Sequence, residues 1–478
     1  MTAYFIGIDV GTQGVRVVLC DETGHVVGSR EAVFPLTESS REEQPPRQWW
    51  ESGWRCLKTL LDALRNDIHL PDVKAIAVTS TSGTIIPLDE QNEPLHNALM
   101  YSDNRPAVEG KMCKAVAEKY HPDGYTGFNA SSGLSKMVWF AHQHPDKTAR
   151  LHTWIHAADY LSGQLSGNFR VTDYTNALKS GYDVKNGVWP AYLFEQLPLK
   201  KAWMQDVVPS GKPIGKLLPE LATALGLPEI TVVAGMTDGC ASQVASGAVR
   251  PGDWNTTIGT TLVVKGVTTR ELKDPEGRLY SHRHPEGYWM PGGASNTGAD
   301  WVTASFGDRL AELTQAAAER IPSPYIAYPL RQQGERFPFL SAQARGFAPE
   351  GLSDADLFTA NLEGVAYLER YAYELIEALS GEKVRAIYTA GGASSSDVWL
   401  TIRSNVLKRP VYKGAQVSGA VGAAILAASR THFKTLTEAV QAMTHVEKEV
   451  KPSAELMRAY DAGYQQFVSA FREKGYIN

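Results

Sequence analysis

A glycine turn near the N-terminus carries residues that can hold a phosphate group. Residues 5–18 are predicted to form a β-strand, a tight turn at Gly11 and Gly14, and a second β-strand, because β-branched residues flank both glycines. Backbone N–H groups around Gly11 and Thr12 can point at a phosphate chain, and Asp9 can hold Mg²⁺ or its water ligands beside that chain. A plain hairpin with a turn-favouring aspartate explains the same residues, since short glycine motifs often carry no function.

Asp238 is the second candidate, because it follows a predicted buried strand at residues 230–234. A carboxylate at such a place can be partly desolvated and still reachable by a ligand, as a general base must be. A helix is predicted for residues 240–246, so a helix N-cap is the competing interpretation. A second glycine turn, at Gly259 and Thr260, follows a short way along the chain, and this combination favours catalysis.

Three further segments consist of small or polar residues that can accommodate other parts of a ligand. Gly391 and Gly392 precede a serine run that ends at Ser396, so a flat purine or a ribose can lie against the backbone there. A strand-to-helix turn with a serine cap is the alternative. Ser82 can meet the hydroxyl groups of a polyol. Asp103 can bind hydroxyl groups as well, or can pair with the arginine two residues later in a surface turn.

Several other devices for binding phosphate or activating a nucleophile are missing from the sequence. It has no G-x-x-x-x-G-K-[ST] loop, no G-x-G-x-x-G after a strand and no G-x-S-x-G elbow. His282 and His284 have no nearby cysteine or third histidine, so a zinc site is not expected. Any nucleotide must therefore be held by paired hairpins.

The elements that position these residues occur twice in the same order. Each half is predicted to contain a hairpin with a glycine turn, then a helix, then a buried strand, then a small-residue loop. In the first half these elements are expected at residues 5–18, 49–64, 73–78 and 80–84, respectively. In the second half the hairpin is expected at 254–264, the helix before residue 384, the strand at 384–389 and the loop at 390–396. Ligands of an open α/β sheet collect at the carboxyl ends of its strands. The repeated order predicts two α/β halves that present their loops to a common cleft.

The predicted domain boundary falls at Pro251–Gly252, where the pattern of elements is interrupted. We expect a first domain over residues 1–249, with an extended insertion at 106–228, and a second over 250–430. Residues 431–478 are predicted to form helices packed on the second domain. A chain of 478 residues is too long for one ordinary core, which agrees with this division.

The composition is that of an ordinary globular protein, with 43% hydrophobic and 21% charged residues. The net charge of −5 gives no basic footprint for nucleic acid, so no nucleic-acid partner is expected. The four scattered cysteines suit a reducing compartment, and no apolar run approaches the ~18 residues of a membrane span. We therefore expect a cytoplasmic protein with no membrane partner, and a homodimer is left open.

Five short motifs, taken together, resemble the FGGY family of carbohydrate kinases within the actin-like ATPase superfamily. They appear in the family's order and span nearly the whole chain, at residues 7–12, 235–239, 258–260, 334–338 and 390–393. The resemblance implies an α/β fold of two ribonuclease-H-like domains with an interdomain cleft. In that cleft MgATP, bound mainly by the second domain, meets a sugar bound mainly by the first.

The resemblance also implies roles for individual residues. Asp238 would be the base that takes the proton from the sugar hydroxyl, and it would contact the sugar together with Ser82 and Asp103. Asp9 would serve Mg²⁺, and Thr12 the phosphates. Further contacts to ATP would come from five small residues of the second domain: Gly259 and Thr260 at the phosphates, and Gly391, Gly392 and Ser396 beside the adenosine.

Within the family the substrate depends on the loop at Ser82 and Gly83. Glycerol kinases carry an Arg-Glu pair there, and typical xylulokinases carry Met-His-Gly. The loop, with segments at residues 131–139, 172–182, 280–282 and 287–296, resembles instead the xylulokinase-like D-ribulose kinases of cyanobacteria and plants. Transfer of the ATP γ-phosphoryl group to O5 of D-ribulose is therefore the leading prediction, with D-xylulose or another pentulose or pentitol as the alternative.

Two functions of other classes compete with a kinase. An actin-like nucleotide switch would use the same fold to present a surface to a protein partner, since fold alone does not fix function. A sugar-binding regulator would have lost catalysis. The sequence favours the kinase, because Asp9 and Asp238 are both present and no extended C-terminal binding module follows.

Overall fold

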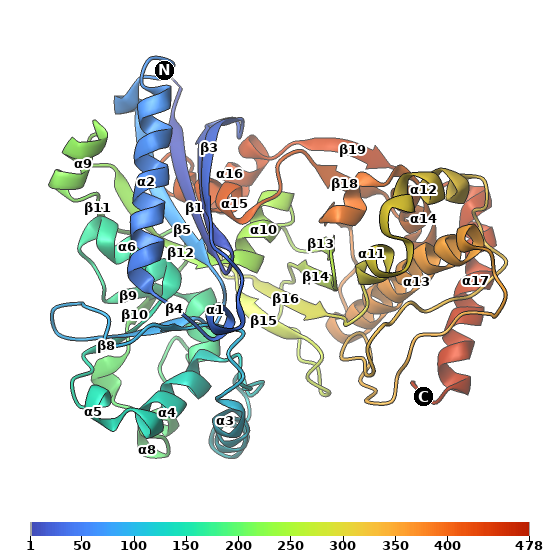
Figure 1. Ribbon diagram of the computed structural model, residues 1–478, viewed down its shortest axis with the longest axis horizontal. Coiled ribbons are helices and arrows are strands. Elements are labelled where there is room, and N and C mark those ends of the chain that lie inside the picture. Colours follow the sequence, from blue (N-terminus) through green and yellow to red (C-terminus); the bar gives the residue numbers. More distant parts are fainter. Residues whose placement is uncertain (1, 478) are drawn as a thin grey trace. The chain divides into compact units, whose positions relative to one another are not determined.

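The computed structural model describes residues 2–477, which form two compact units (Figure 1). Unit 1 contains the chain up to Ala245 together with residues 282–287 and 416–444. Unit 2 contains residues 246–281 and 288–415 and the chain from residue 445 onward. In the described part of the chain, no helix is both long and apolar enough to cross a membrane.

A six-stranded sheet forms the centre of unit 1, in the order β11-β12-β5-β1-β2-β3. Its central pairs β1–β5 and β5–β12 are parallel, whereas β1–β2, β2–β3 and β11–β12 are antiparallel. The strands are β1 (Tyr4–Gly11), β2 (Gly14–Asp21), β3 (Val26–Val33), β5 (Val73–Ser80), β11 (Pro213–Lys216) and β12 (Thr231–Thr237). The predicted hairpin and buried strands are therefore confirmed.

The sheet of unit 2 repeats this arrangement. Its strands lie in the order β15-β16-β14-β13-β17-β18-β19. The run β16-β14-β13-β17-β18 matches the run β3-β2-β1-β5-β12 of unit 1, both in order and in which neighbouring strands are parallel or antiparallel. The strands are β13 (Asp253–Ile258), β14 (Leu262–Gly266), β15 (Tyr280–Arg283), β16 (Trp289–Ala294), β17 (Ala386–Ala390), β18 (Val411–Gly414) and β19 (Val446–Val450). The internal duplication predicted from the sequence is thus present in the fold.

Helices cover the sheets of both units and close their cores. In unit 1 apolar side chains of β1 and β2 pack on α2, whose start at Pro46 satisfies the preference of proline for the first helical turn. The main helices of unit 1 are α2 (Pro46–Leu64), α3 (Ala107–Tyr120), α4 (Gly133–Gln143), α6 (Ala157–Ser166) and α10 (Asp238–Ser246). Unit 2 contains α11 (Asp300–Phe306), α12 (Leu310–Ala318), α13 (Asp354–Ser380), α14 (Asp397–Leu407) and α17 (Ala454–Glu473).

The predicted insertion at residues 106–228 combines helices with short strands. One of these strands, β8 (Thr153–His156), joins a small antiparallel sheet in the order β4-β7-β6-β8, whose other strands are β4 (Glu43–Gln44), β7 (Ala98–Leu99) and β6 (Ile85–Leu88). A separate apolar cluster around α3 and α4 stabilises this part of unit 1.

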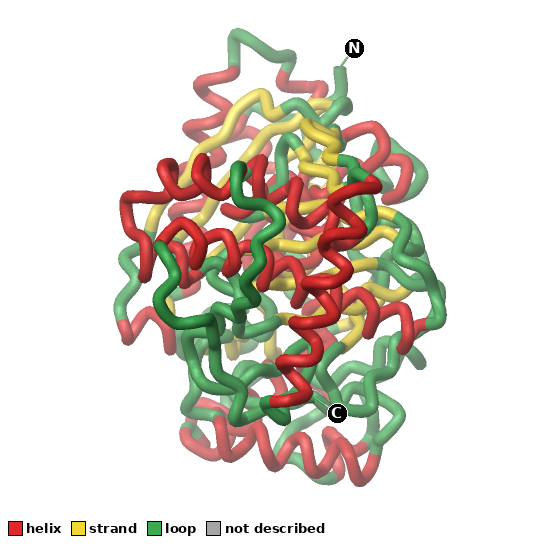
Figure 2. Tube along the Cα trace, turned by 90° about the vertical axis from the view of Figure 1, so that its right-hand side faces the viewer, coloured by secondary structure: helices red, strands yellow, loops and turns green. Residues whose placement is uncertain are grey.

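The unit boundaries differ from the predicted domains at residues 282–287 and, over a longer segment, at 416–444. This segment holds α15 (Gly419–Ala428) and α16 (Leu436–Met443), which were expected in or on the second domain, and it belongs to unit 1. The reason is close packing on β1: a Cβ atom on Gly7 would lie 1.9 Å from the carbonyl oxygen of Ala420. The last helix, α17, does belong to unit 2, and Figure 2 shows it running to the C-terminal label.

Candidate functional site

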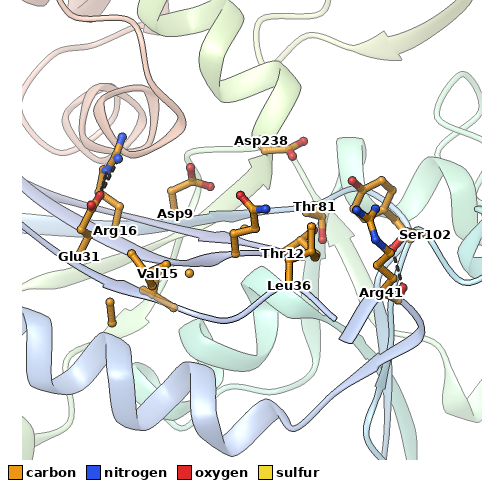
Figure 3. A pocket seen from close by; sticks show the side chains of 16 residues that line it. Asp9, Thr12, Val15, Arg16, Glu31, Leu36, Arg41, Thr81, Ser102 and Asp238 are labelled. Carbon is orange, nitrogen blue, oxygen red and sulfur yellow. Dashed lines mark hydrogen bonds and ion pairs between the residues drawn. The ribbon is translucent and has the colours of Figure 1, made fainter. Parts of the chain in front are cut away.

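A cavity of about 640 Å³ opens beside the tip of the β1–β2 hairpin in unit 1. Its size is in the range of small-molecule sites. The side chains of Asp9 and Asp238 both line it, Asp9 from the strand and Asp238 from the start of α10 (Figure 3). The other lining residues are Gly11, Thr12, Gln13, Gly14, Val15, Arg16, Glu31, Ala32, Val33, Leu36, Arg41, Thr81, Tyr101 and Ser102.

Asp9 lies against the N-terminus of α15 because of the alternation of side chains along β1. Phe5, Gly7 and Asp9 share the face that α15 covers, whereas the residues between them join the apolar core on the other face. A Cβ atom on Gly419 would lie 2.6 Å from Oδ2 of Asp9, so glycine leaves the space that the carboxylate fills. The backbone N–H groups at the start of α15 favour negative charge there.

The Asp9 carboxylate is half-buried, and its ionisation is disfavoured. Burial is the main cause that raises its pKa to about 7, the negative charge of Asp238 adds to it, and Arg16 opposes both. Arg16 itself pairs with Glu31 at 2.6 Å. Oδ1 of Asp9 is buried and accepts no hydrogen bond from residues 2–477. Two neighbouring carboxylates with one unused oxygen form a site that favours a cation.

The residues fit Mg²⁺ held through one carboxylate, water and phosphate oxygens. Mg²⁺ keeps several of its waters and commonly binds through one or two carboxylates together with the phosphates of a substrate. Within the described range no cluster of three or more His, Cys, Asp or Glu side chains could hold a metal on its own. The single unused oxygen of Asp9 agrees with such a water- and phosphate-mediated site.

Thr12 lies at the two-residue tip of the hairpin, between Gly11 and Gly14, which pair with each other. A buried glutamine stabilises this tip: Nε2 of Gln44 donates a hydrogen bond to the carbonyl oxygen of Thr12 at 2.8 Å. The indole N–H of Trp49 donates in turn to Oε1 of Gln44, also at 2.8 Å. Sequence reasoning missed Gln44, because a glutamine in a polar stretch looks like a surface residue.

Asp238 is the first residue of α10, which begins two residues earlier than predicted. The residue before the helix is therefore Thr237, and the N-cap interpretation does not describe Asp238. One carboxylate oxygen, Oδ1, accepts the backbone N–H of Gly239 at 2.6 Å. The side chain is half-buried and lines the cavity, as a general base requires.

The backbone just before Asp238 is anchored by a buried polar network. The N–H of Thr237 donates to Oγ1 of Thr175 at 2.8 Å, and this hydroxyl donates to Oδ1 of Asp173 at 2.7 Å. Asp173 is fully buried, and burial together with the nearby charge of Asp159 raises its pKa. The network fixes where β12 ends and therefore where α10 and Asp238 begin. No local sequence signal indicated it.

Ser82 and Asp103, the predicted sugar contacts, lie next to the cavity residues but differ in their availability. Oγ of Ser82 is buried and has no hydrogen-bond partner among residues 2–477. Asp103 is fully buried, and its two oxygens each accept a hydrogen bond from the Arg105 guanidinium at 2.9 Å. The pairing alternative is therefore the observed one for Asp103, although the pair is not a surface turn. A sugar hydroxyl would have to compete with Arg105.

The predicted nucleotide residues other than Thr12 lie in unit 2. Gly259 and Thr260 form the turn between β13 and β14, and a Cβ atom on Gly259 would meet nothing within 4 Å. Gly391, with φ of +87°, packs on the end of β13, since its Cβ atom would lie 2.6 Å from the carbonyl oxygen of Ile258. Gly392 is exposed, and Ser396 caps α14 by accepting the N–H of Trp399. The serine-cap alternative is thus observed at Ser396.

The fold is that of two-domain α/β proteins of the actin-like ATPase type. The crystal structure of a ligand-bound xylulose kinase from Lactobacillus acidophilus superposes with a TM-score of 0.85 over 98% of both chains at 22% identity. This likeness confirms the predicted fold class of two ribonuclease-H-like domains.

The family models of the FGGY carbohydrate kinases match residues 4–245 with their N-terminal domain and residues 254–430 with their C-terminal domain. The chain belongs to the FGGY family of carbohydrate kinases. It is therefore a phosphotransferase that acts on a sugar hydroxyl and uses ATP, and the nucleotide-switch and regulator alternatives are set aside.

Two curated relatives show the range of sugars in similar proteins. The xylulose kinase of Escherichia coli K12 is 27% identical over 98% of this chain and 99% of its own length. The gluconokinase of Bacillus subtilis 168 is 26% identical over 89% of this chain and 87% of its own length.

Proposed function

We propose that the protein is an ATP-dependent pentulose kinase that phosphorylates the terminal hydroxyl group of D-xylulose. The observation that carries the proposal is the pair of carboxylates, Asp9 and Asp238, in one cavity of a size suited to a small molecule. The comparisons favour D-xylulose over the D-ribulose predicted from the sequence, because xylulose kinases are similar over nearly the whole chain.

D-Ribulose is the second candidate, and the loop after β5 supports it. The chain has Ser82 and Gly83 where typical xylulokinases carry Met-His-Gly. Gly83 has φ of +85°, and its Cβ atom would lie 2.3 Å from the carbonyl oxygen of Ser131. The backbone there therefore requires glycine, and the difference from Met-His-Gly lies at Ser82, whose buried Oγ has no hydrogen-bond partner among residues 2–477.

In the proposed reaction Asp238 is the general base. The sugar hydroxyl oxygen forms a bond to the γ-phosphorus, the bond from that phosphorus to the bridging oxygen of ADP breaks, and the hydroxyl proton passes to the Asp238 carboxylate. The half-buried position at the start of α10 suits this role, since it keeps the carboxylate desolvated but accessible. The hydrogen bonds of Thr175 to Thr237 and Asp173 would keep the Asp238 carboxylate in the position that the reaction needs.

The other predicted residues would hold ATP and its metal. Asp9 would hold Mg²⁺ through its unused oxygen, and Thr12 would bind phosphate at the hairpin tip. The bound Mg²⁺ would neutralise charge on the transferring phosphoryl group. The phosphates would also contact Gly259 and Thr260, and the adenosine would lie against Gly391, Gly392 and Ser396.

A screen of ATP-coupled ADP release tests the proposal with D-xylulose, D-ribulose, L-xylulose, L-ribulose, D-gluconate, glycerol and pentitols. We expect kcat/KM to be highest for D-xylulose. A clear preference for D-ribulose would exchange the two candidates, and a preference for D-gluconate or glycerol would refute the pentulose assignment. The cytoplasmic location and the oligomeric state stay predictions, the latter testable by light scattering.

A further inference from the structure

The motif at residues 334–338 has no part in the proposed function, yet its glutamate is the centre of a dense hydrogen-bond network in unit 2. Glu335 is only 4% exposed. Its carboxylate accepts hydrogen bonds from the hydroxyls of Ser295 (2.8 Å), Thr297 (3.0 Å) and Tyr328 (2.7 Å) and from the backbone N–H groups of Asn296 (2.7 Å) and Arg336 (2.9 Å). These donors use the acceptor capacity of one carboxylate fully.

Three of the five donors belong to the loop at residues 295–298, which follows β16. A further bond ties this loop to the glutamate segment, since Nδ2 of Asn296 donates to the carbonyl oxygen of Gly334 at 2.9 Å. The conformation of the loop is therefore fixed largely by the segment that contains Glu335.

This loop and the residue after it, Ala299, hold both sides of the β13–β14 turn. The N–H of Leu262 donates to the carbonyl oxygen of Thr297 at 3.0 Å, and the N–H of Ala299 donates to the carbonyl oxygen of Gly259 at 2.7 Å. Packing is close as well: a Cβ atom on Gly298 would lie 2.5 Å from the carbonyl oxygen of Thr260. The turn thus rests on the loop through hydrogen bonds and through direct contact.

We propose that Glu335 is a positioning residue for nucleotide binding, which acts on the Gly259–Thr260 turn through the loop at 295–298. This inference rests on the proposed role of that turn at the ATP phosphates. Backbone donors stabilise phosphate charge only when they are fixed in advance. Glu335 itself need not touch the nucleotide, because its effect passes through the carbonyl oxygens of Gly259 and Thr297.

The substitution Glu335→Gln tests this chain of contacts with little change in volume. The amide has one acceptor oxygen and one NH₂ group, so it turns donors toward the hydroxyls and N–H groups that the carboxylate satisfied. A matched control is Glu363→Gln in the same unit. Glu363 is also fully buried and accepts from the N–H of Ser323 (2.9 Å) and the hydroxyl of Tyr460 (3.0 Å), with no bond to the loop or the turn.

Binding of a fluorescent ADP analogue in the presence of Mg²⁺ is the primary measurement, on the full-length protein. We expect Kd to rise about tenfold in E335Q and to stay within about twofold in E363Q. In steady-state assays the KM for ATP should rise in E335Q while the KM for the sugar is unchanged. Loss of stability alone would not produce that split.

Equal Kd values for E335Q and wild type, or equal weakening in E335Q and E363Q, would overturn the inference. So would wild-type protein that binds no ADP. If E335Q fails to fold, the double variant S295A/T297V removes two of the donors from the loop and should raise Kd about threefold. A wild type that binds ADP but phosphorylates no sugar would refute the proposed function, while the Kd values would still decide the role of Glu335.

Discussion

The β1–β2 hairpin of unit 1 and the β13–β14 hairpin of unit 2 share one backbone plan but differ in charge. Both pair antiparallel within the hairpin and parallel with the next strand of their sheet, and both carry Gly-Thr at the tip. Aligning these tips places Thr257 at the position of Asp9. The Thr257 hydroxyl accepts a hydrogen bond from Nδ2 of Asn255 at 3.0 Å, whereas Oδ1 of Asp9 accepts no hydrogen bond from residues 2–477.

The two hairpins also differ in what supports them. In unit 1 α15 packs closely on β1 at Gly7, and Gln44 donates a hydrogen bond to the tip of the hairpin. In unit 2 the loop at 295–298, itself held by Glu335, supports the turn. The comparison teaches that a duplicated hairpin can be specialised by single positions: under our proposal the first hairpin holds the metal through Asp9 as well as phosphate, and the second holds phosphate through neutral donors alone.

The largest expected effect is that of Asp238→Asn. Removing the proposed base while keeping the shape of the side chain should lower kcat about 1000-fold, within the range for general-base catalysis. Binding of ADP and of the sugar should change less than about threefold. Coupled ADP release and calorimetric titration measure these quantities, and a variant with near wild-type turnover would remove Asp238 from the mechanism.

Matched substitutions at Asp9 and Thr257, which occupy the same position in the two hairpins, test whether the hairpins have different roles. Asp9→Asn should lower kcat about 100-fold and weaken the dependence of the rate on Mg²⁺ concentration, because the amide has no negative charge and only one oxygen to offer a cation. The matched substitution Thr257→Val in unit 2 should lower kcat less than about threefold. Similar losses in both variants would contradict the specialisation of the first hairpin.

The pKa of Asp9 predicts a pH dependence of stability in the metal-free protein. The pKa rises from 3.8 to about 7 on folding, so between these values the folded state holds a proton that the unfolded chain has lost. The contribution of Asp9 to the free energy of unfolding must therefore become less favourable as pH rises from about 4 to about 7. Relative to wild type, the free energy of unfolding of Asp9→Asn should be on the order of 4 kcal/mol higher at pH 8 than at pH 4.

Urea unfolding at several pH values measures this difference. The comparison with Asp9→Asn is needed because burial also raises the pKa of Glu363, to about 8. A difference between variant and wild type that stays constant with pH would contradict the raised pKa of Asp9.

The smallest expected effect concerns the network behind Asp238. Thr175→Val removes the hydroxyl that accepts the N–H of Thr237 and donates to Asp173. We expect kcat to fall about tenfold through misplacement of Asp238, with a loss of about 1–3 kcal/mol in unfolding free energy. Thr175→Ser keeps the hydroxyl and should restore kcat. Equal kcat for Thr175→Val and wild type would show that the network is structural only.

Local sequence patterns were sufficient for the first hairpin and for the duplicated order of strands. The glycines at the tip and the β-branched residues around them gave strand bounds within a few residues of β1 and β2. Local patterns of this kind also located Asp9 and Asp238, because each of these aspartates lies near the end of an apolar strand.

Long-range packing could not be predicted in the same way. The apolar sequence of α15 fits any buried surface, and only the missing side chain of Gly7 shows that this surface is β1. Gln44, Thr175 and Glu335 act through partners 32, 62 and about 40 residues away, and such pairings leave no local pattern. The resemblance to the family identified the motif around Glu335 but assigned it no role.

Phosphorus NMR of a reaction that contains the protein, MgATP and D-xylulose tests the central claim most directly. The account predicts that the γ-phosphate signal of ATP is replaced by equal amounts of ADP and one new phosphomonoester on the terminal sugar oxygen, and that Asp238→Asn forms both about 1000-fold more slowly. Inorganic phosphate in place of the ester, or an ester formed equally fast by Asp238→Asn, would contradict it.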